Sequence, residues 1–281
     1  MKYSNAMVNK YIEFKEKKFH YYTAGTGADA IIAIHGYGET GAHFYHLAQH
    51  IPEGFKMIAI DLPWHGKTGW NDRNQFFQED LFQVINKLIL EENCANGKVV
   101  LLGYSLGGRI ALSLFEKYPQ FFRSMILIAP DGFRKNFWYW FATKTWFGRM
   151  LFTYTLKYPA WLQATVKLFS SLGLITTGLK KFIKFHIDER SARDALHIRW
   201  MGLRAFQPNL SNIKSFIKKY EVKVEIIYGK NDRIISYKAG QRFARGLEEF
   251  CTVHILEGGH RLLLPEFVAL YGKVITSVGE S

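Results

Sequence analysis

The chain has 281 residues but only two cysteines, Cys94 and Cys251, which are too few for a disulfide framework. We expect both thiols to be reduced and at least half-buried, as in proteins of a reducing compartment. No cluster of histidine, cysteine, aspartate and glutamate has the spacing of a metal site, so we expect no metal. The glycine loop of a dinucleotide site and any nucleic-acid recognition motif are also missing, so we expect no cofactor and no nucleic-acid partner.

Long apolar runs are missing as well. No stretch of about 18 uninterrupted apolar residues exists, so we expect no transmembrane helix. The N-terminal stretch Met1–Tyr22 has neither a continuous apolar core nor a small-residue cleavage site, and it predicts no signal peptide. We therefore expect a cytoplasmic protein, whether free or peripheral at a membrane surface.

Acidic residues are missing from the middle of the chain, where none lies between Gly132 and Ile187. This stretch carries nine basic residues and supplies most of the formal net charge of +13. The nine are Arg134, Lys135, Lys144, Arg149, Lys157, Lys167, Lys180, Lys181 and Lys184. The segment from Asp131 to Pro208 also holds five of the seven tryptophans, which are Trp138, Trp140, Trp146, Trp161 and Trp200.

Three interpretations of this basic, aromatic segment stay open. A charge excess is most often a solvated surface. Basic residues interleaved with Trp, Phe and Leu also suit a peripheral contact with a membrane or lipid surface. Thirdly, a positive field attracts anionic substrates.

The chain does contain a regular alternation of short apolar runs and amphipathic stretches. Runs such as Ala30–Ile34 and Val99–Leu102 are wholly apolar, which predicts strands buried on both faces. The alternation indicates the α/β class, with a mostly parallel, doubly wound sheet of about eight strands. The expected strands are a pair within Tyr11–Thr23, then Ala30–Ile34, Lys56–Ile60, Val99–Leu102, Ser124–Ala129, Val222–Tyr228 and Thr252–Leu256.

The helical pattern divides the chain into two parts. We expect residues 1–130 and 209–281 to form the α/β core, and residues 131–208, in which no strand is evident, to form an inserted helical cap or lid. The expected core helices are Ala42–His50, Gln75–Glu92, Leu106–Tyr118, Ser236–Glu249 and a last helix that opens at Gly258-Gly259-His260 and runs to Ser277.

Ser105 lies in the pattern G-x-S-x-G, between an expected strand and an expected helix. So tight a turn needs small residues two positions before and after the serine, which are Gly103 and Gly107. The hydroxyl would stand at the carboxyl end of a strand and at a helix N-terminus, which favours negative charge. His35, Asp61, Asp232 and His260 also follow strands, and ligands of such sheets bind at this edge.

Together these motifs resemble those of the α/β-hydrolase fold family in its capped form. The matching residues are HGYG at 35–38, DLPWHGKT at 61–68, GYSLGG at 103–108, YGKND at 228–232 and GGH at 258–260. The order Ser, Asp, His along the chain is the order that this fold uses. Two positions depart from the family: Trp64, which we expect to reach the site rim or cover the loop, and Thr68, where serine is common.

The resemblance implies a role for each residue of a catalytic triad. Ser105 would be the nucleophile, His260 the general base and Asp232 the carboxylate that orients His260. Asp131 is a competitor for the third role, because it also follows a strand and some members of the family place the acid there.

The backbone N–H groups of Tyr37 and Leu106 would form the oxyanion hole. We expect His35 and His65 to stabilise loops instead of taking part in catalysis. The aromatic residues of 131–208 either line an apolar acyl pocket or form the small core of the cap itself.

The sequence thus predicts a serine hydrolase that cleaves small to medium apolar carboxylic esters through an acyl-enzyme at Ser105. Two alternatives stay open. One is a hydrolase of carbon–carbon bonds that uses the same triad. The other is a ligand-binding or scaffold protein that keeps the fold without turnover.

Overall fold

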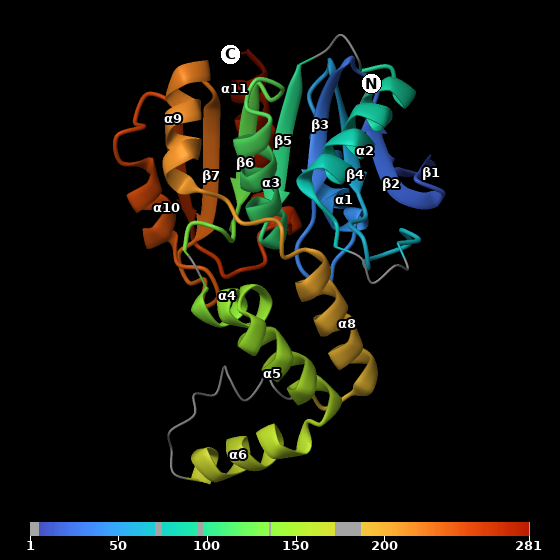
Figure 1. Cartoon of the computed structure of the whole chain (residues 1–281). Helices are drawn as coiled ribbons and strands as arrows, with labels where there is room; N and C mark the ends of the chain where they lie inside the picture. Colours follow the sequence, from blue (N-terminus) through green and yellow to red (C-terminus); the bar gives the residue numbers. More distant parts are fainter. Residues whose placement is uncertain (1–5, 71–74, 95–97, 135, 172–186, 281) are drawn as a thin grey trace. The chain divides into compact units, whose positions relative to one another are not determined.

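The computed structural model describes residues 6–70, 75–94, 98–134, 136–171 and 187–280 (Figure 1). The chain divides into two compact units. The core unit comprises Met1–Asn71, Phe77–Arg134 and Phe206–Ser281, and the helical unit comprises Asp72–Phe76 and Lys135–Ala205.

The core unit is built on one eight-stranded sheet with the order β1-β2-β4-β3-β5-β6-β7-β8 (Figure 1). Strand β2 pairs antiparallel with β1 and β4, and all other neighbours pair parallel. The strands are β1 Val8–Phe14, β2 Lys17–Gly25, β3 Asp29–Ile34, β4 Phe55–Ile60, β5 Val99–Tyr104, β6 Ser124–Ile128, β7 Lys223–Gly229 and β8 Cys251–Leu256. This mostly parallel sheet confirms the predicted fold class.

Helices cover both faces of this sheet, which explains why the central strands are apolar along their whole length. All residues of β5 and β6 are buried. On one face, α1 and α11 pack over a cluster that includes Ile31, Met57 and Leu102; α2 and α3 lie on the other face (Figure 1). The core-unit helices are α1 Tyr45–Ala48, α2 Gln78–Glu91, α3 Leu106–Lys117, α9 Leu210–Tyr220, α10 Tyr237–Ala244 and α11 Val268–Glu280.

Three expected helices have different bounds in the structure. The last one does not open at His260: a loop carries His260, and the helix starts only after a 3₁₀ turn over Pro265–Phe267, where a proline suits a helical first turn because it has no N–H to satisfy. Helix α10 ends five residues before Glu249, because Gly246 takes a left-handed φ of 76° and turns the chain. The expected helix 42–50 is a 3₁₀ turn, Gly41–Phe44, followed by the short α1.

Helix α9 was not expected, although its start has a recognisable signal. The Asn209 side chain accepts hydrogen bonds from the backbone N–H groups of Ser211 and Asn212 at 3.0 and 3.4 Å. An asparagine in this position satisfies donors that the first helical turn leaves open.

At the connection from β5 to α3, the backbone of the first turn of α3 lies very close to the backbone of β5 and β3. A Cβ atom at Gly103 would lie 2.6 Å from the Gly107 carbonyl oxygen, and one at Gly107 would overlap the carbonyl oxygen of Ile34 on β3. Glycine is therefore required at both positions, as the spacing around Ser105 predicts.

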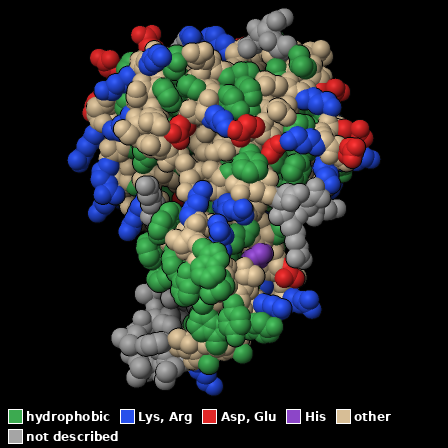
Figure 2. Space-filling view, in the orientation of Figure 1, with side chains coloured by type: hydrophobic (Ala, Val, Ile, Leu, Met, Phe, Trp, Pro, Cys, Tyr) green, Lys and Arg blue, Asp and Glu red, His purple; other side chains and the backbone are tan. Residues whose placement is uncertain are grey.

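The helical unit contains α4 Phe137–Lys144, α5 Trp146–Lys157, α6 Ala160–Ser171 and α8 Arg190–Gly202. No strand occurs in its described residues. Four of the nine basic residues named above, Lys135, Lys180, Lys181 and Lys184, lie outside the described residues. Figure 2 shows many hydrophobic side chains on the surface of this unit, with lysine and arginine side chains near them.

Aromatic contacts hold α4, α5 and α8 together. The Trp200 ring lies 5.1 Å from Tyr139 and 5.2 Å from Phe152, centroid to centroid. Phe76, which we expected in the core, belongs to this unit, and its N–H donates to the Gly202 carbonyl at 2.9 Å. These contacts give the helical unit a small core of its own; its role as a lid stays a prediction. Within the described chain, no helix has the length and apolar character needed to span a bilayer.

We predict that Gly107→Ala destabilises the core unit by about 3 kcal/mol, because the new methyl group meets backbone atoms that cannot move aside. Gly272→Ala on α11 is the matched control: its nearest heavy atoms are 3.7 Å away, and alanine favours a helix by up to about 1 kcal/mol. Urea unfolding followed by circular dichroism measures both. Equal stabilities of the two variants would contradict the packing described here.

Candidate active site

Ser105 occupies the sharp turn between β5 and α3 with φ 52° and ψ −114°. A side chain at positive φ is strained, typically by about 1–3 kcal/mol. Hydrogen bonds on both sides hold this conformation. The Ser105 N–H donates to the Ile128 carbonyl at 3.0 Å, and the Ser105 carbonyl accepts from the N–H groups of Gly108 at 3.0 Å and Asp131 at 2.9 Å.

His260 joins the serine to a carboxylate. Its Nε2 lies 3.0 Å from Ser105 Oγ, and its Nδ1 lies 2.7 Å from Asp232 Oδ2. Because a carboxylate only accepts hydrogen bonds, a neutral His260 with its proton on Nδ1 satisfies both contacts. The three side chains come from the ends of β5, β7 and β8 and meet as the sequence predicts, with 18% of the His260 side chain exposed.

Asp232 is held from both of its oxygen atoms. Oδ2 faces His260, and Oδ1 accepts the N–H groups of Ile234 at 2.7 Å and Ile235 at 2.9 Å. Burial by itself would raise the pKa of this carboxyl, but the hydrogen bonds from His260 and the two amides, with the electrostatic interaction with His260, bring the pKa below its ordinary value. The Asp232 carboxyl is therefore ionised at neutral pH, and its hydrogen bonds fix its orientation.

Asp131 has a different set of contacts. Its Oδ2 lies 3.4 Å from the Arg109 guanidinium, and its Oδ1 accepts the Gly132 N–H at 2.8 Å. Of the two aspartates that the sequence left open, the structure brings Asp232 to His260.

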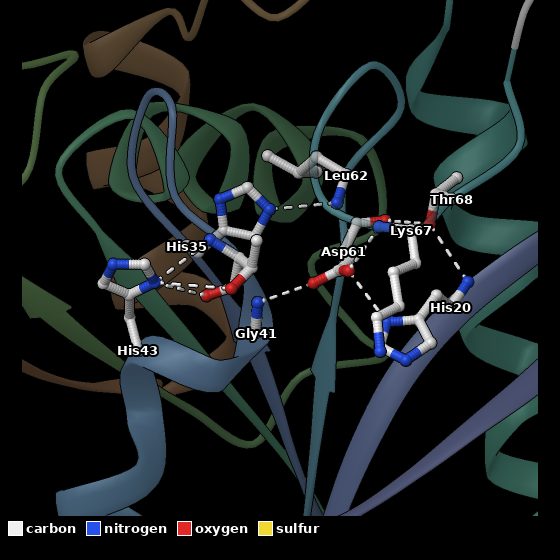
Figure 3. A network of polar contacts seen from close by, with 9 residues as sticks. His20, His35, Gly41, His43, Asp61, Leu62, Lys67 and Thr68 are labelled. Atoms are coloured by element: carbon white, nitrogen blue, oxygen red, sulfur yellow. Dashed lines mark hydrogen bonds and ion pairs between the residues drawn. The ribbon is translucent and has the colours of Figure 1, made fainter.

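A buried network ties together the loops next to this site (Figure 3). Asp61 is fully buried; its Oδ1 accepts the Gly41 N–H at 2.7 Å, and its Oδ2 accepts the Lys67 N–H at 2.9 Å and lies 2.8 Å from His20 Nδ1. The Thr68 hydroxyl donates to the Asp61 carbonyl at 2.7 Å and accepts the His20 N–H at 3.0 Å. One carboxylate thus joins β2 to the loops that follow β3 and β4.

His35 and His65 have loop-stabilising contacts, the role that the sequence predicts for them. His35 Nε2 accepts the Leu62 N–H at 3.0 Å (Figure 3). Its Nδ1 lies 2.7 Å from the Gly36 carbonyl. His65 Nδ1 lies 2.9 Å from the Pro63 carbonyl. Both rings are buried and meet edge to face at 5.1 Å.

The segments of Tyr37 and Leu106 lie next to each other. Leu106 opens α3, and a Cβ atom on the following glycine would come within 2.8 Å of the His35 carbonyl oxygen. The loop after His35 is closed by the Gly36 N–H, which donates to Glu39 Oε2 at 3.1 Å. Burial raises the pKa of the Glu39 carboxyl, although the charge of His43 and the Gly36 amide act against this rise.

Sequence reasoning missed Tyr104, the residue before the proposed nucleophile. Its hydroxyl donates to the His260 carbonyl at 3.1 Å, and the two rings lie 5.6 Å apart. The same elbow therefore carries Ser105 and supports the loop of His260. Trp64 is half-buried with φ 61°, and its expected position at the site rim stays a prediction.

The described residues contain no group of three or more histidine, cysteine or carboxylate side chains that could hold a metal ion. Cys94 and Cys251 are both buried and free.

Comparison with known proteins gives the family. A family model described as serine aminopeptidase, S33, matches residues 27–266. The chain belongs to this family of α/β hydrolases. It is an enzyme, a hydrolase with esterase- and lipase-named relatives.

Two relatives and one solved structure illustrate the similarity. An uncharacterised hydrolase of Bacillus subtilis is 23% identical over 85% of this chain and 85% of its own length. A pimeloyl-[acyl-carrier protein] methyl ester esterase of Wigglesworthia glossinidia brevipalpis is 25% identical over 79% of this chain and 82% of its own. A thermophilic esterase from Thermogutta terrifontis has the same fold, with a TM-score of 0.66, 14% identity, and coverage of 98% of this chain and 99% of its own.

We predict that Asp232→Asn lowers stability in a pH-dependent way. The folded pKa of Asp232 lies below its unfolded value, so its ionisation stabilises the fold above the unfolded pKa, and this contribution is lost as the pH falls through the folded pKa. The difference in unfolding free energy between wild type and variant should be constant above about pH 5 and shrink below about pH 4. Urea unfolding across this range measures it, with Ser105→Ala as a control that keeps the carboxylate. A difference that does not change with pH would contradict the assignment.

Proposed function

We propose that this enzyme is a serine hydrolase that cleaves small to medium apolar carboxylic esters. The observation that carries the proposal is the hydrogen-bonded line from Asp232 through His260 to Ser105 Oγ, with heavy-atom separations of 2.7 and 3.0 Å. These separations are within the range for direct proton transfer and orientation.

In the first half of the reaction, Ser105 Oγ attacks the ester carbonyl carbon while His260 Nε2 takes the hydroxyl proton. The negative charge that develops on the carbonyl oxygen is stabilised by the backbone N–H groups of Tyr37 and Leu106. Asp232 stabilises the imidazolium through Nδ1–H. The tetrahedral intermediate then collapses: the carbon–oxygen bond to the alcohol breaks, the alcohol takes the proton from His260, and Ser105 holds the acyl group.

In the second half, water replaces the alcohol. His260 Nε2 takes a proton from the water as its oxygen attacks the acyl carbon, and the same two amides stabilise the oxyanion. Collapse breaks the bond to Ser105 Oγ, which regains its proton from His260, and the carboxylic acid leaves. During both halves Asp232 holds the imidazole at Nδ1, and the Tyr104 hydroxyl holds the backbone of the same residue at the His260 carbonyl.

Charge and relatives support an ester as the substrate. An aminopeptidase must bind a cationic N-terminus, whereas this chain has a net charge of +13 and no acidic residue from Gly132 to Ile187. Neutral and anionic acyl compounds suit such a field better. One relative, at 25% identity, is named as a methyl ester esterase.

Ser105→Ala should abolish hydrolysis of short p-nitrophenyl esters and labelling by a fluorophosphonate probe, because the methyl side chain has no nucleophile. Unfolding by heat checks that the variant stays folded. Full residual turnover in a folded Ser105→Ala protein would overturn the proposal. Parallel assays with an amino-acid p-nitroanilide and with a β-diketone-like ring-fission substrate distinguish ester from peptide and from carbon–carbon bond cleavage.

The two aspartates can be separated by activity. Asp232→Asn should lower kcat by about 10⁴-fold, because the amide holds the wrong tautomer of His260. Asp131→Asn, whose side chain contacts Arg109 and Gly132, should stay within about threefold of wild type. The reverse ranking would assign the role to Asp131.

A further inference from the structure

The outer surface of α4 and α5 is aromatic. Trp138 and Trp146 each have 72% of their surface exposed, and Phe137 has 61%. The other large exposed side chains of these helices are Trp140, Phe147, Met150 and Tyr154. Soluble proteins seldom expose so many large apolar side chains together, and such patches mark binding surfaces. Figure 2 shows this hydrophobic surface on the helical unit. We call these seven residues the aromatic surface.

On helix α5 the exposed apolar side chains are distinct from those that form the core of the helical unit. One side of α5 packs inward, where Leu156 is buried and Phe152 stacks on Trp200 of α8. Phe147, Met150 and Tyr154 recur at helical spacing on the exposed side. The helix is apolar on both sides, whereas an ordinary surface helix is polar on its outer side.

Positive charges accompany the aromatic surface. The exposed Lys144 ends α4, and the half-buried Arg149 lies on α5. Burial and then the charge of Arg204 lower the pKa of Lys144; burial and then the charge of Arg149 lower the pKa of Arg204. Arg204 therefore lies close enough to repel both Lys144 and Arg149. Among the described residues, no carboxylate pairs with Lys144 or Arg149.

We propose that the aromatic surface docks this enzyme on a lipid bilayer that contains anionic phospholipids. Tryptophan and tyrosine favour the boundary between headgroups and acyl chains, because their rings are apolar and their N–H and O–H groups are polar. Lys144 and Arg149 attract the lipid phosphates, which supply the counter-charge that the described residues do not provide. Docking is peripheral, since no helix of the described chain could span the bilayer.

Charge complementarity selects the bilayer over a protein partner or a second copy. A second copy would bring the same uncompensated cations to the interface, and like charges there are unfavourable. An anionic membrane surface matches both the apolar rings and the positive charge of this surface, and its fluid boundary accommodates side chains that project by different amounts.

Co-sedimentation of the full chain with lipid vesicles tests whether positive charge on the helical unit contributes to membrane binding. Binding should be strong to phosphatidylcholine mixed with phosphatidylglycerol, weak to phosphatidylcholine alone, and reduced by salt. Lys144→Glu/Arg149→Glu should lower binding at least about tenfold, because each basic residue near an anionic surface contributes several-fold. Lys218→Glu/Lys219→Glu, on α9 of the core unit, makes the same change of net charge and should leave binding within about twofold.

The aromatic contribution has its own test. Trp138→Ala/Trp146→Ala should weaken vesicle binding about tenfold or more, and Tyr45→Ala/Leu90→Ala, two exposed apolar residues of the core unit, should not. Lipids brominated along their acyl chains should quench wild-type tryptophan fluorescence and quench the double tryptophan variant much less. Unfolding by heat checks that each variant keeps the fold.

The proposal is overturned if the two vesicle types bind equally, if the α9 charge variant loses as much binding as the Lys144/Arg149 variant, or if the tryptophans are not quenched. Dimerisation in sedimentation equilibrium without vesicle binding would assign the aromatic surface to a second copy and would also overturn it. Vesicle binding does not depend on hydrolysis, so Ser105→Ala should bind as wild type does, and failure of the proposed chemistry would leave this result unchanged.

Discussion

The close backbone contact between the first turn of α3 and the ends of β3 and β5 is the constraint on which the site depends. It forces glycine at positions 103 and 107, and it leaves Ser105 in a conformation that a side chain seldom takes. The same contact brings the start of α3 against the loop after β3, where Tyr37 lies. The position of the proposed nucleophile and those of two candidate oxyanion donors thus follow from one packing requirement. The hydrogen bonds to Ile128, Gly108 and Asp131 offset the strain that this packing produces.

Much of this architecture could be predicted from local patterns in the sequence. The apolar runs predict the strands because residues buried on both faces of a sheet must be apolar, and the glycines around Ser105 predict the elbow because the clash they avoid is local. At that level Asp232 was the prediction for the orienting carboxylate, with Asp131 as its competitor. The choice between them depends on the direction of the loop after β7, which hydrogen bonds to Ile234 and Ile235 set.

Long-range contacts were the part that the sequence could not reveal. The hydrogen bond from Tyr104 to the His260 carbonyl joins residues 156 positions apart, and no periodicity marks it. The pairing of His20 with Asp61 is likewise invisible, because each residue alone reads as an ordinary polar group in a strand or loop. The helical unit differs: its aromatic and basic composition was evident, but only the structure separates the rings that pack together, such as Phe152 and Trp200, from those that face outward.

The buried carboxylate of Asp61 changes the meaning of the N-terminal strand pair. By topology β1 and β2 form an antiparallel edge, remote in sequence from every proposed catalytic residue. Through His20, however, β2 holds the carboxylate that anchors Gly41 and Lys67, and Gly41 ends the loop that begins at His35. The first strands are thus part of the framework of the loops next to the candidate active site. Damage to this end of the chain would remove the His20 contact to Asp61 and so weaken the anchoring of the loops at Gly41 and Lys67.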